Sequence, residues 1–213
     1  MSRWICLMAL LFWSCAIIAQ VNYSKKVMYG LEVGINNGQQ QLRQSYQVAE
    51  MRSGLRVGVS LEKPATRRLT FISTMSFVQS GARNVRFSNM DERINYAEFS
   101  IKAVEYLPVG GSDLFLSLGP YLSYGINGKV TNTNGQIVTN NPFDLAEYQR
   151  AEWGLGGNLG FKTPWGTYLQ AGIQTAFNNF YESNESKFFN YSLMLTVGHT
   201  IGWSSFKTYR KVL

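Results

Sequence analysis

The chain has 213 residues, with 20 Lys and Arg against 13 Asp and Glu, and a formal net charge of +7. Charged residues make up only 15% of it, against about 25% in ordinary soluble domains, while aromatic residues reach 14%. Much of the surface is therefore not expected to face water. The surplus positive charge is spread over predicted loops and the tail, which argues against a nucleic-acid groove.

Residues 1–19 have the features of a secretory signal peptide. Arg3 supplies a basic start, residues 4–18 are almost unbrokenly apolar, and Ala19 is small, as a cleavage site requires. The run of about fifteen apolar residues is shorter than the roughly 20 that a spanning helix needs. We therefore expect cleavage after Ala19 and a mature domain over residues 20–213. An uncleaved anchor is the alternative.

Both cysteines, Cys6 and Cys15, lie inside this segment. The mature domain is therefore expected to have no disulfide and no cysteine metal site. Lipidation of Cys15 is a further alternative, although the bulky residues before it differ from the usual lead-in to a lipidated cysteine.

After residue 20 a period of two dominates the pattern of apolar residues. In residues 114–125 one face carries leucines, a proline and a tyrosine, while the other carries mostly small or polar residues. The same alternation predicts eight strands in all. Their expected ranges are 29–35, 55–61, 69–78, 94–107, 114–125, 151–162, 167–176 and 191–201.

The connections between these strands alternate in length. Short turns are expected at residues 62–68, 108–113 and 163–166, and long loops at 36–52, 79–93, 126–150 and 177–190. Long loops at one end and short turns at the other are typical of outer-membrane barrels. The predicted fold is all-β: an eight-stranded antiparallel up-and-down transmembrane β-barrel with long extracellular loops and short periplasmic turns.

Periodicity alone does not say which face points inward, because a soluble lipocalin-like barrel alternates equally well. The polar face here is mainly Gly, Ser, Thr and Asn with about one charge per strand, which suits a packed interior better than a surface in water. We therefore expect the apolar face to contact lipid and the interior to lack an open pore. Seven aromatic residues near strand ends are interpreted as interfacial girdles: Tyr29, Tyr106, Tyr124, Trp153, Phe161, Trp165 and Tyr168.

Four segments together resemble the outer-membrane β-barrel domain proteins of Gram-negative bacteria, a family often labelled porin family or PorT-like. They are Phe77-Val78-Gln79-Ser80-Gly81-Ala82-Arg83, Asn95-Tyr96-Ala97-Glu98-Phe99-Ser100-Ile101, Leu118-Gly119-Pro120-Tyr121-Leu122-Ser123-Tyr124 and Trp153-Gly154-Leu155-Gly156-Gly157-Asn158-Leu159-Gly160. Ser100 stands where the family usually has Pro, and the chain continues past the last strand instead of ending on a terminal aromatic. The resemblance implies location in the outer membrane and the barrel fold more than it implies a task.

Five charged residues fall on the predicted inner face: Glu32, Arg56, Glu98, Lys102 and Glu152. Opposed carboxylates could do acid–base work. The preferred interpretation is a structural network of paired charges that plugs the interior, because a buried charge is tolerated only when it is paired.

No catalytic, cofactor or metal site is predicted. His199 is the only histidine, and its strand phase places it on the lipid-facing side near the periplasmic rim. Gly154, Gly156, Gly157 and Gly160 lie inside a predicted strand, so they do not form a dinucleotide-binding turn and are expected to relieve crowding in a narrow barrel.

The function expected from the sequence is that of a monomeric outer-membrane barrel with a structural or binding role, not an enzyme and not a pore. The expected partners are outer-membrane lipid and lipopolysaccharide, the barrel-insertion machinery, and an unidentified extracellular ligand of loop 126–150. Three alternatives stay open: an accessory barrel of a secretion or gliding system, which a partner of the basic tail 207–211 would favour; a lipid-modifying barrel enzyme; and a secreted lipocalin-like carrier.

Overall fold

The computed structural model describes residues 27–42, 49–66, 68–85, 90–132, 134–144, 149–178 and 188–202. The predicted signal peptide, its cleavage site and the basic tail lie outside these residues. The elements in chain order are β1 (Met28–Leu42), β2 (Glu50–Pro64), β3 (Leu69–Val85), β4 (Met90–Val109), β5 (Ser112–Asn132), β6 (Ile137–Thr139), the short 3-10 helix η2 (Pro142–Asp144), β7 (Ala151–Lys162), β8 (Thr167–Ala176) and β9 (Phe188–Ile201).

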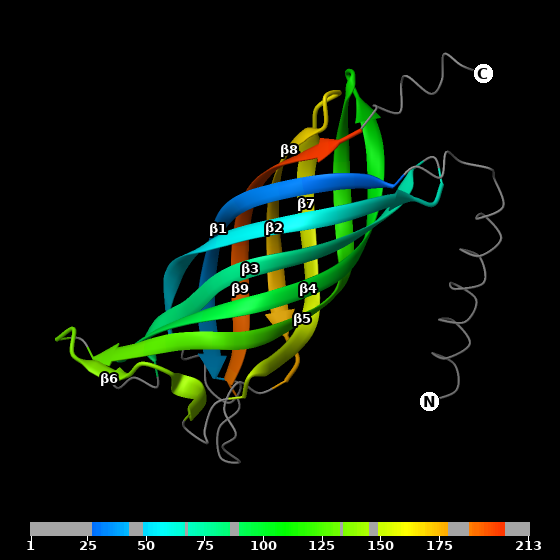
Figure 1. The fold of residues 1–213 in the computed structure, drawn as a ribbon. Coiled ribbons are helices and arrows are strands. Elements are labelled where there is room, and N and C mark those ends of the chain that lie inside the picture. Colours follow the sequence, from blue (N-terminus) through cyan, green and yellow to red (C-terminus); the bar gives the residue numbers. More distant parts are fainter. Residues whose placement is uncertain are drawn as a thin grey trace.

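Eight long strands close into a ring of antiparallel pairs (Figure 1). Seven pairings join them in the order β4, β3, β2, β1, β9, β8, β7 and β5, and the pairing of β4 with β5 closes the ring. The first and last strands meet over the full length of β1, from Tyr29 opposite Ile201 to Leu42 opposite Phe188. The predicted eight-stranded up-and-down barrel is therefore confirmed, with β6 as a short ninth strand beside the end of β5.

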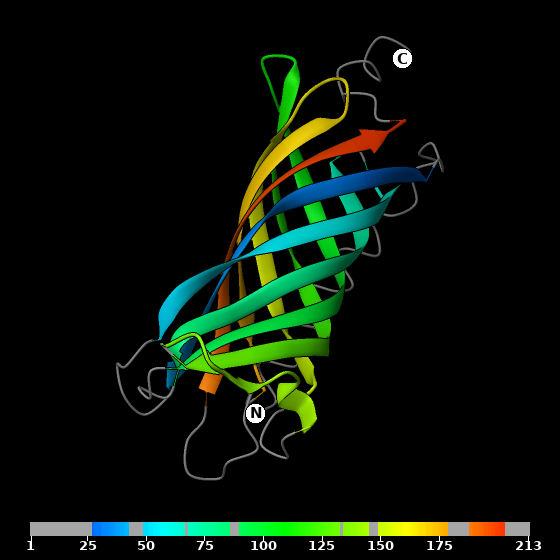
Figure 2. The same cartoon turned by 60° about the vertical axis from the view of Figure 1, so that its left-hand side comes forward.

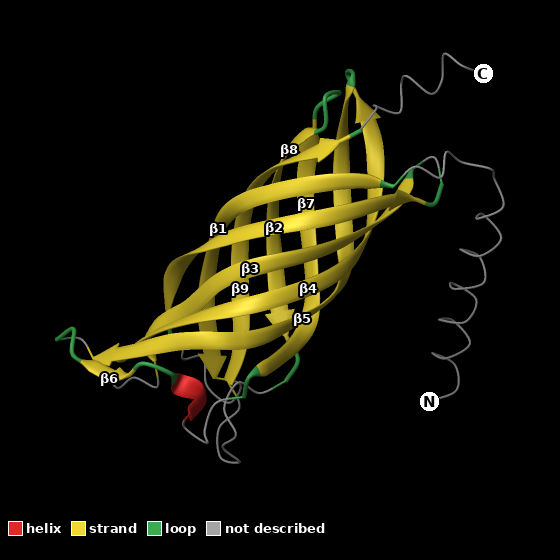
Figure 3. Ribbon diagram, viewed as in Figure 1, coloured by secondary structure: helices red, strands yellow, loops and turns green. Residues whose placement is uncertain are grey.

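The two ends of the barrel differ in their connections (Figures 2 and 3). At one end, β2–β3, β4–β5 and β7–β8 are joined by tight hairpins. The β4–β5 turn needs positive φ at both central residues, and Gly110 and Gly111 supply it at 63° and 119° without steric strain. The other connections lie at the opposite end, which carries β6 and η2. We refer to these two ends as the hairpin end and the loop end. The long loop predicted at 79–93 is wrong: β3 and β4 stay paired to Val85 and Met90, so only residues 86–89 join them.

The strands are longer at the loop end than the sequence indicated. The range 126–150 was interpreted as one loop, but residues 126–132 belong to β5 and 137–139 form β6. Likewise β1 runs on to Leu42 and β3 to Val85. Polar residues interrupt the apolar alternation in these extensions, so the alternating pattern ends although the backbone pairing continues. For this reason loops were predicted there.

The wall separates apolar from polar residues by face. On β5, every second residue from Leu114 to Tyr124 is exposed, while the alternate ones from Asp113 to Gly125 are buried. The exposed set over the whole barrel is rich in Leu, Val, Ile and Phe, and the buried set is rich in Ser, Thr, Gln and charged residues. The predicted outward orientation of the apolar face is confirmed. Within the described residues, no helix has the length and hydropathy of a membrane span.

Two of the seven predicted girdle aromatics were misassigned. Tyr106 and Tyr168 are 1% and 7% exposed, so they point into the barrel, whereas the other five are exposed. The strand phase explains the difference, because Tyr106 lies an even number of residues from the inward-facing Glu98 and Lys102. An aromatic residue near a strand end does not by itself distinguish a girdle from an inner layer.

Candidate functional site

Arg56 of β2 lies at the centre of a buried charge cluster inside the barrel. Its Nε donates to Glu32 Oε1 of β1 at 3.1 Å, and its Nη1 forms an ion pair with Glu98 Oε1 of β4 at 2.9 Å. Its Nη2 donates to Ser76 Oγ of β3 at 3.1 Å. The three charged side chains are at most 5% exposed. One guanidinium therefore connects four consecutive strands on the inner side.

Strands β8 and β5 contribute neutral donors to the same two carboxylates. Tyr168 Oη and Gln170 Nε2, both from β8, donate to Glu32 Oε2 at 3.2 and 3.3 Å. Gln174 Nε2 donates to Glu98 Oε1 at 3.1 Å, and Ser123 Oγ of β5 donates to Glu98 Oε2 at 3.3 Å. Ser123 is the register partner of Glu98 on the adjacent strand, but the β8 bonds pass through the interior, so the cluster does not line one wall alone.

A second ion pair lies nearer the hairpin end. Lys162 Nζ of β7 donates to both oxygens of Glu62 of β2, at 2.8 and 3.0 Å, and both side chains are 1% exposed. Thr200 Oγ1 of β9 donates to Glu62 Oε1 at 2.6 Å. The ammonium also lies 5.6 and 5.5 Å from the ring centroids of Tyr106 and Tyr168, which adds cation–π attraction.

Between the two ion-paired layers is a small polar cavity of about 30 Å³, which has room for one or two water molecules. Lys102 lines it and is 7% exposed. When the Asn158 amide oxygen faces the cavity, it accepts from Lys102 Nζ at 3.1 Å and from Ser117 Oγ at 3.3 Å. Arg56, Lys102 and Lys162 balance Glu32, Glu62 and Glu98 in formal charge, and the buried Asp113, the register partner of Lys162, adds one further carboxylate.

Glu152 lies apart from these charges. It accepts from Tyr121 Oη at 2.9 Å and from Asn190 Nδ2, and no cation pairs with it among the described residues. Hydrogen bonds from neutral donors thus take the place of an ion pair at this level of the barrel.

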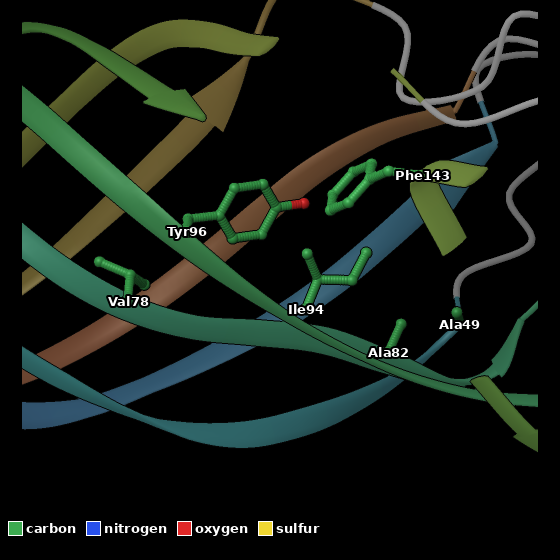
Figure 4. Close-up of a cluster of buried hydrophobic side chains, with 6 residues drawn as sticks. All are labelled: Ala49, Val78, Ala82, Ile94, Tyr96 and Phe143. Carbon is green, nitrogen blue, oxygen red and sulfur yellow. The ribbon is translucent and has the colours of Figure 1, made fainter. Parts of the chain in front are cut away.

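An apolar cluster lies at the loop end of the interior (Figure 4), beside a buried hydrogen bond from Gln40 Nε2 to Glu92 Oε2 at 3.0 Å. Phe143 of η2 enters the mouth and packs with five buried residues of the wall and the nearby chain: Ala49, Val78, Ala82, Ile94 and Tyr96. Its ring lies so close to Gly125 that a Cβ at that position would overlap it. On its other side, the Arg150 guanidinium lies 5.1 Å from the ring centroid. The connection after β5 therefore covers the barrel mouth from inside.

The five charged residues singled out from the sequence all face inward, but they are not one network. Glu32, Arg56 and Glu98 are in direct contact, Lys102 contacts Asn158 beside them, and Glu152 has its own neutral partners. The sequence did not predict Glu62 on the inner face, because the strand was expected to end at Leu61. Continuing the alternation of Arg56, Gly58 and Ser60 by one step would have placed Glu62 inside.

The two other features considered as possible sites, His199 and the glycines of β7, have few polar neighbours. His199 is exposed on the outer face, where its Nδ1 lies 3.1 Å from Thr167 Oγ1. In the part of the chain that the structure describes, no carboxylate contacts this ring, and no group of three His, Cys, Asp or Glu residues is placed to hold a metal. The glycines of β7 fit the predicted role in relieving crowding, since a Cβ at Gly160 would overlap the Phe115 ring.

A closed antiparallel barrel with an apolar outer face and a polar, filled interior defines a class of integral outer-membrane proteins. Residues 18–182 match the family described as "Outer membrane protein beta-barrel domain", and the chain belongs to this family. It is a protein of the bacterial outer membrane. No curated protein sequence matches the chain significantly.

Several solved structures are similar in fold. Ail, the attachment invasion locus protein of Yersinia pestis, has a TM-score of 0.49 at 14% identity and covers 83% of this chain and 99% of its own. Neisserial surface protein A has a TM-score of 0.48 at 13% identity, covering 80% and 96%. OprG from Pseudomonas aeruginosa has a TM-score of 0.46 at 11% identity, covering 85% and 99%.

Proposed function

We propose that the protein is a closed, monomeric outer-membrane barrel that displays its loop end at the cell surface as a structural or binding element and conducts no solutes. The observation that carries this proposal is the bonding across the interior. Arg56 joins Glu32 and Glu98, and β8 side chains reach the same carboxylates from the opposite wall. A solute path along the axis would have to break these bonds.

The apolar mouth supports the same conclusion. Phe143 and its neighbours exclude water at the loop end, and the cavity below them, about 30 Å³, admits water molecules but no ordinary nutrient. With the Lys162–Glu62 pair, which joins β7 to β2, three barriers therefore stand in series along the axis.

Conductance in a planar lipid bilayer tests this proposal. The folded wild-type barrel is expected to give no steady current steps above background. A variant that combines Arg56→Ala, Lys162→Ala and Phe143→Ala removes a central residue from each barrier and is expected to conduct, whereas Lys63→Ala, which removes an exposed charge of the same strand as Arg56, is not. Stable porin-like steps from the wild type would overturn the closed-barrel proposal.

The loop end is also the better surface for binding. There β5 continues beyond its pairing with β7, which ends at Tyr124, and carries β6 on its edge. This projection presents Ile137 and Val138, two consecutive apolar side chains that are 51% and 53% exposed. We place the contact with an extracellular ligand on this projection, within the range 126–150.

Thiol labelling tests the orientation on which display depends. Val138→Cys at the loop end and Lys63→Cys at the hairpin end can be compared on intact cells with a membrane-impermeant maleimide. Labelling of position 138 in intact cells, and of position 63 only after permeabilisation, is the expected result. The reverse pattern would place the projection in the periplasm and end the proposal of display.

The proposal assigns no catalysis to this barrel. The His199 imidazole faces outward near the hairpin end with a threonine hydroxyl as its neighbour. The interior carboxylates are engaged by Arg56, Lys162 or neutral donors. The outer-membrane lipid, the insertion machinery and the loop ligand are the partners proposed for the chain.

A further inference from the structure

The outer face of β3, β4 and β5 changes character toward the loop end. The apolar band ends at a level where Phe77, Ala97 and Tyr124 are register partners. One level further lies a row of amides: Gln79 Nε2 donates to Asn95 Oδ1 at 3.1 Å, and Asn95 Nδ2 donates to Asn127 Oδ1 at 2.7 Å. This row indicates that the wall leaves the hydrocarbon region here, because lipid tails offer such groups no alternative partners.

The next level carries two cations side by side. Arg93 of β4 and Lys129 of β5 are direct register partners, and both side chains are exposed. Each alternates with buried neighbours, Glu92 and Ile94 on one strand and Val130 on the other, so both point outward. On the other side of Arg93 its register partner is Gly81, which has no side chain to fill the space.

Nearby charges leave this pair positive. Arg52 forms an ion pair with Asp91 at 3.5 Å, so this carboxylate already has a partner. Glu50 is the register partner of Arg83 and can offset the charge of Arg83, but not that of Arg93 and Lys129, which face each other. Arg83 lies two residues beyond Gly81, the register partner of Arg93, and is exposed beside buried Ala82, so it points outward near Arg93. Across the described residues, no carboxylate is within 4.0 Å of Arg93, Lys129 or Arg83.

Like charges directly opposite each other on a sheet destabilise it. An anion placed between Arg93 and Lys129 would offset this repulsion and accept charge-assisted hydrogen bonds from both. Phosphate suits the pair, because Arg presents a planar fork of donors and Lys a compact ammonium.

We propose that Arg93 and Lys129, with Arg83 beside them, bind the phosphate of a lipid headgroup in the outer leaflet, that of phosphorylated lipid A. This inference rests on the proposed orientation, with the loop end at the cell surface, and specifies the lipid contact of the outer face; binding in detergent tests it independently of that orientation.

The position of Arg93 and Lys129 along the barrel axis favours a lipid ligand over a soluble polyanion. Gly81 is four positions beyond Phe77, which corresponds to about 13 Å along the strand and, at a tilt near 40°, to about 10 Å along the barrel axis. Lys and Arg side chains can bend back toward the bilayer while their stems cover apolar surface. Their charges thus reach the headgroup layer, directly above the side chains that contact the acyl chains.

The experiment compares lipid binding by folded barrels in zwitterionic detergent. Phosphorylated lipid A is titrated against the wild type, against Arg93→Gln/Lys129→Gln, and against the matched control Lys63→Gln/Arg68→Gln, which removes two exposed cations at the hairpin end. We expect the first double variant to bind about 10- to 30-fold more weakly, since each cation near an anionic headgroup contributes severalfold to affinity, and the control to match the wild type. Removing the phosphates from the lipid A should weaken binding to the wild type by a similar factor.

Three further measurements make the test decisive. A boiled-against-unboiled gel verifies that each variant is folded, and Arg93→Lys/Lys129→Arg should retain most of the binding. Equal affinity of the wild type and Arg93→Gln/Lys129→Gln for phosphorylated lipid A would overturn the proposal. A heparin oligosaccharide that binds these two residues without being displaced by lipid A would also overturn it, in favour of a soluble polyanion.

Discussion

Ser117 and Leu118 are neighbours on β5, yet Ser117 is 3% exposed and Leu118 is 62% exposed. The same contrast runs around the barrel: the inner face buries polar and charged groups, and the outer face presents apolar ones. In water this arrangement would be unfavourable on both sides. In a bilayer the outer face meets hydrocarbon, and the inner face is stable because its charges have partners. The inner face should therefore depend on specific bonds, and the outer face only on being apolar.

The largest effect should come from removing the central cation of the inner face. Arg56→Ala leaves Glu32 and Glu98 buried without their cation, which should cost about 3–5 kcal/mol of unfolding free energy. Urea unfolding in detergent, followed by the gel shift between folded and boiled protein, measures the loss. Lys63→Ala on the same strand is the control and should change little. If Arg56→Met combined with Glu32→Gln and Glu98→Gln is no more stable than Arg56→Ala, pairing is not what makes the site sensitive.

The outer face should be disrupted by a charge instead. Leu118→Arg places a cation on the lipid side near the middle of the apolar band, where the cost is about 2–4 kcal/mol. Leu118→Val should leave the unfolding free energy nearly unchanged, because fluid lipid tails pack equally well against either side chain. Unfolding in lipid vesicles measures both. A tolerated Arg at this position would show that the band does not lie in the bilayer core.

The Phe143 cluster at the mouth is apolar, so truncating the Phe143 side chain should act through lost packing. Phe143→Ala removes the ring that packs against Ile94, Tyr96 and Gly125, and we expect a loss of about 2 kcal/mol, below the usual cost in a full core because η2 lies in a connection and not in the sheet. Phe143→Leu should restore most of it. Unfolding free energies of the two variants, measured side by side, check the order.

The smallest effect distinguishes a supporting hydrogen bond from an ion pair. Ser123→Ala removes one donor to Glu98, whose other partners, Arg56 and Gln174, remain. The expected loss is about 1 kcal/mol. A loss as large as that of Arg56→Ala would contradict the view that Arg56 dominates this carboxylate.

Much of this fold was predictable from residue order alone. The ranges expected for β7 and β8 match the observed ones, because the alternation there continues to a Thr-Pro-Trp-Gly turn. The composition of the polar face, small residues and few charges, correctly indicated which side of the wall faces inward. Both signals are local, since they depend on one strand and its period of two.

What needed the tertiary structure is which inward residues meet. Lys162 and Glu62 are 100 residues apart, and Tyr168 and Glu32 are 136 apart. Their contacts depend on how the strands are staggered around the closed ring, and the sequence of one strand does not specify this stagger. The same holds for Arg93 and Lys129 on the outer face and for Phe143 in the mouth. The sequence by itself determined the strands, their two faces and the membrane as their solvent; ring closure and register decided the partners, because hydrogen bonding between strands sets which levels coincide.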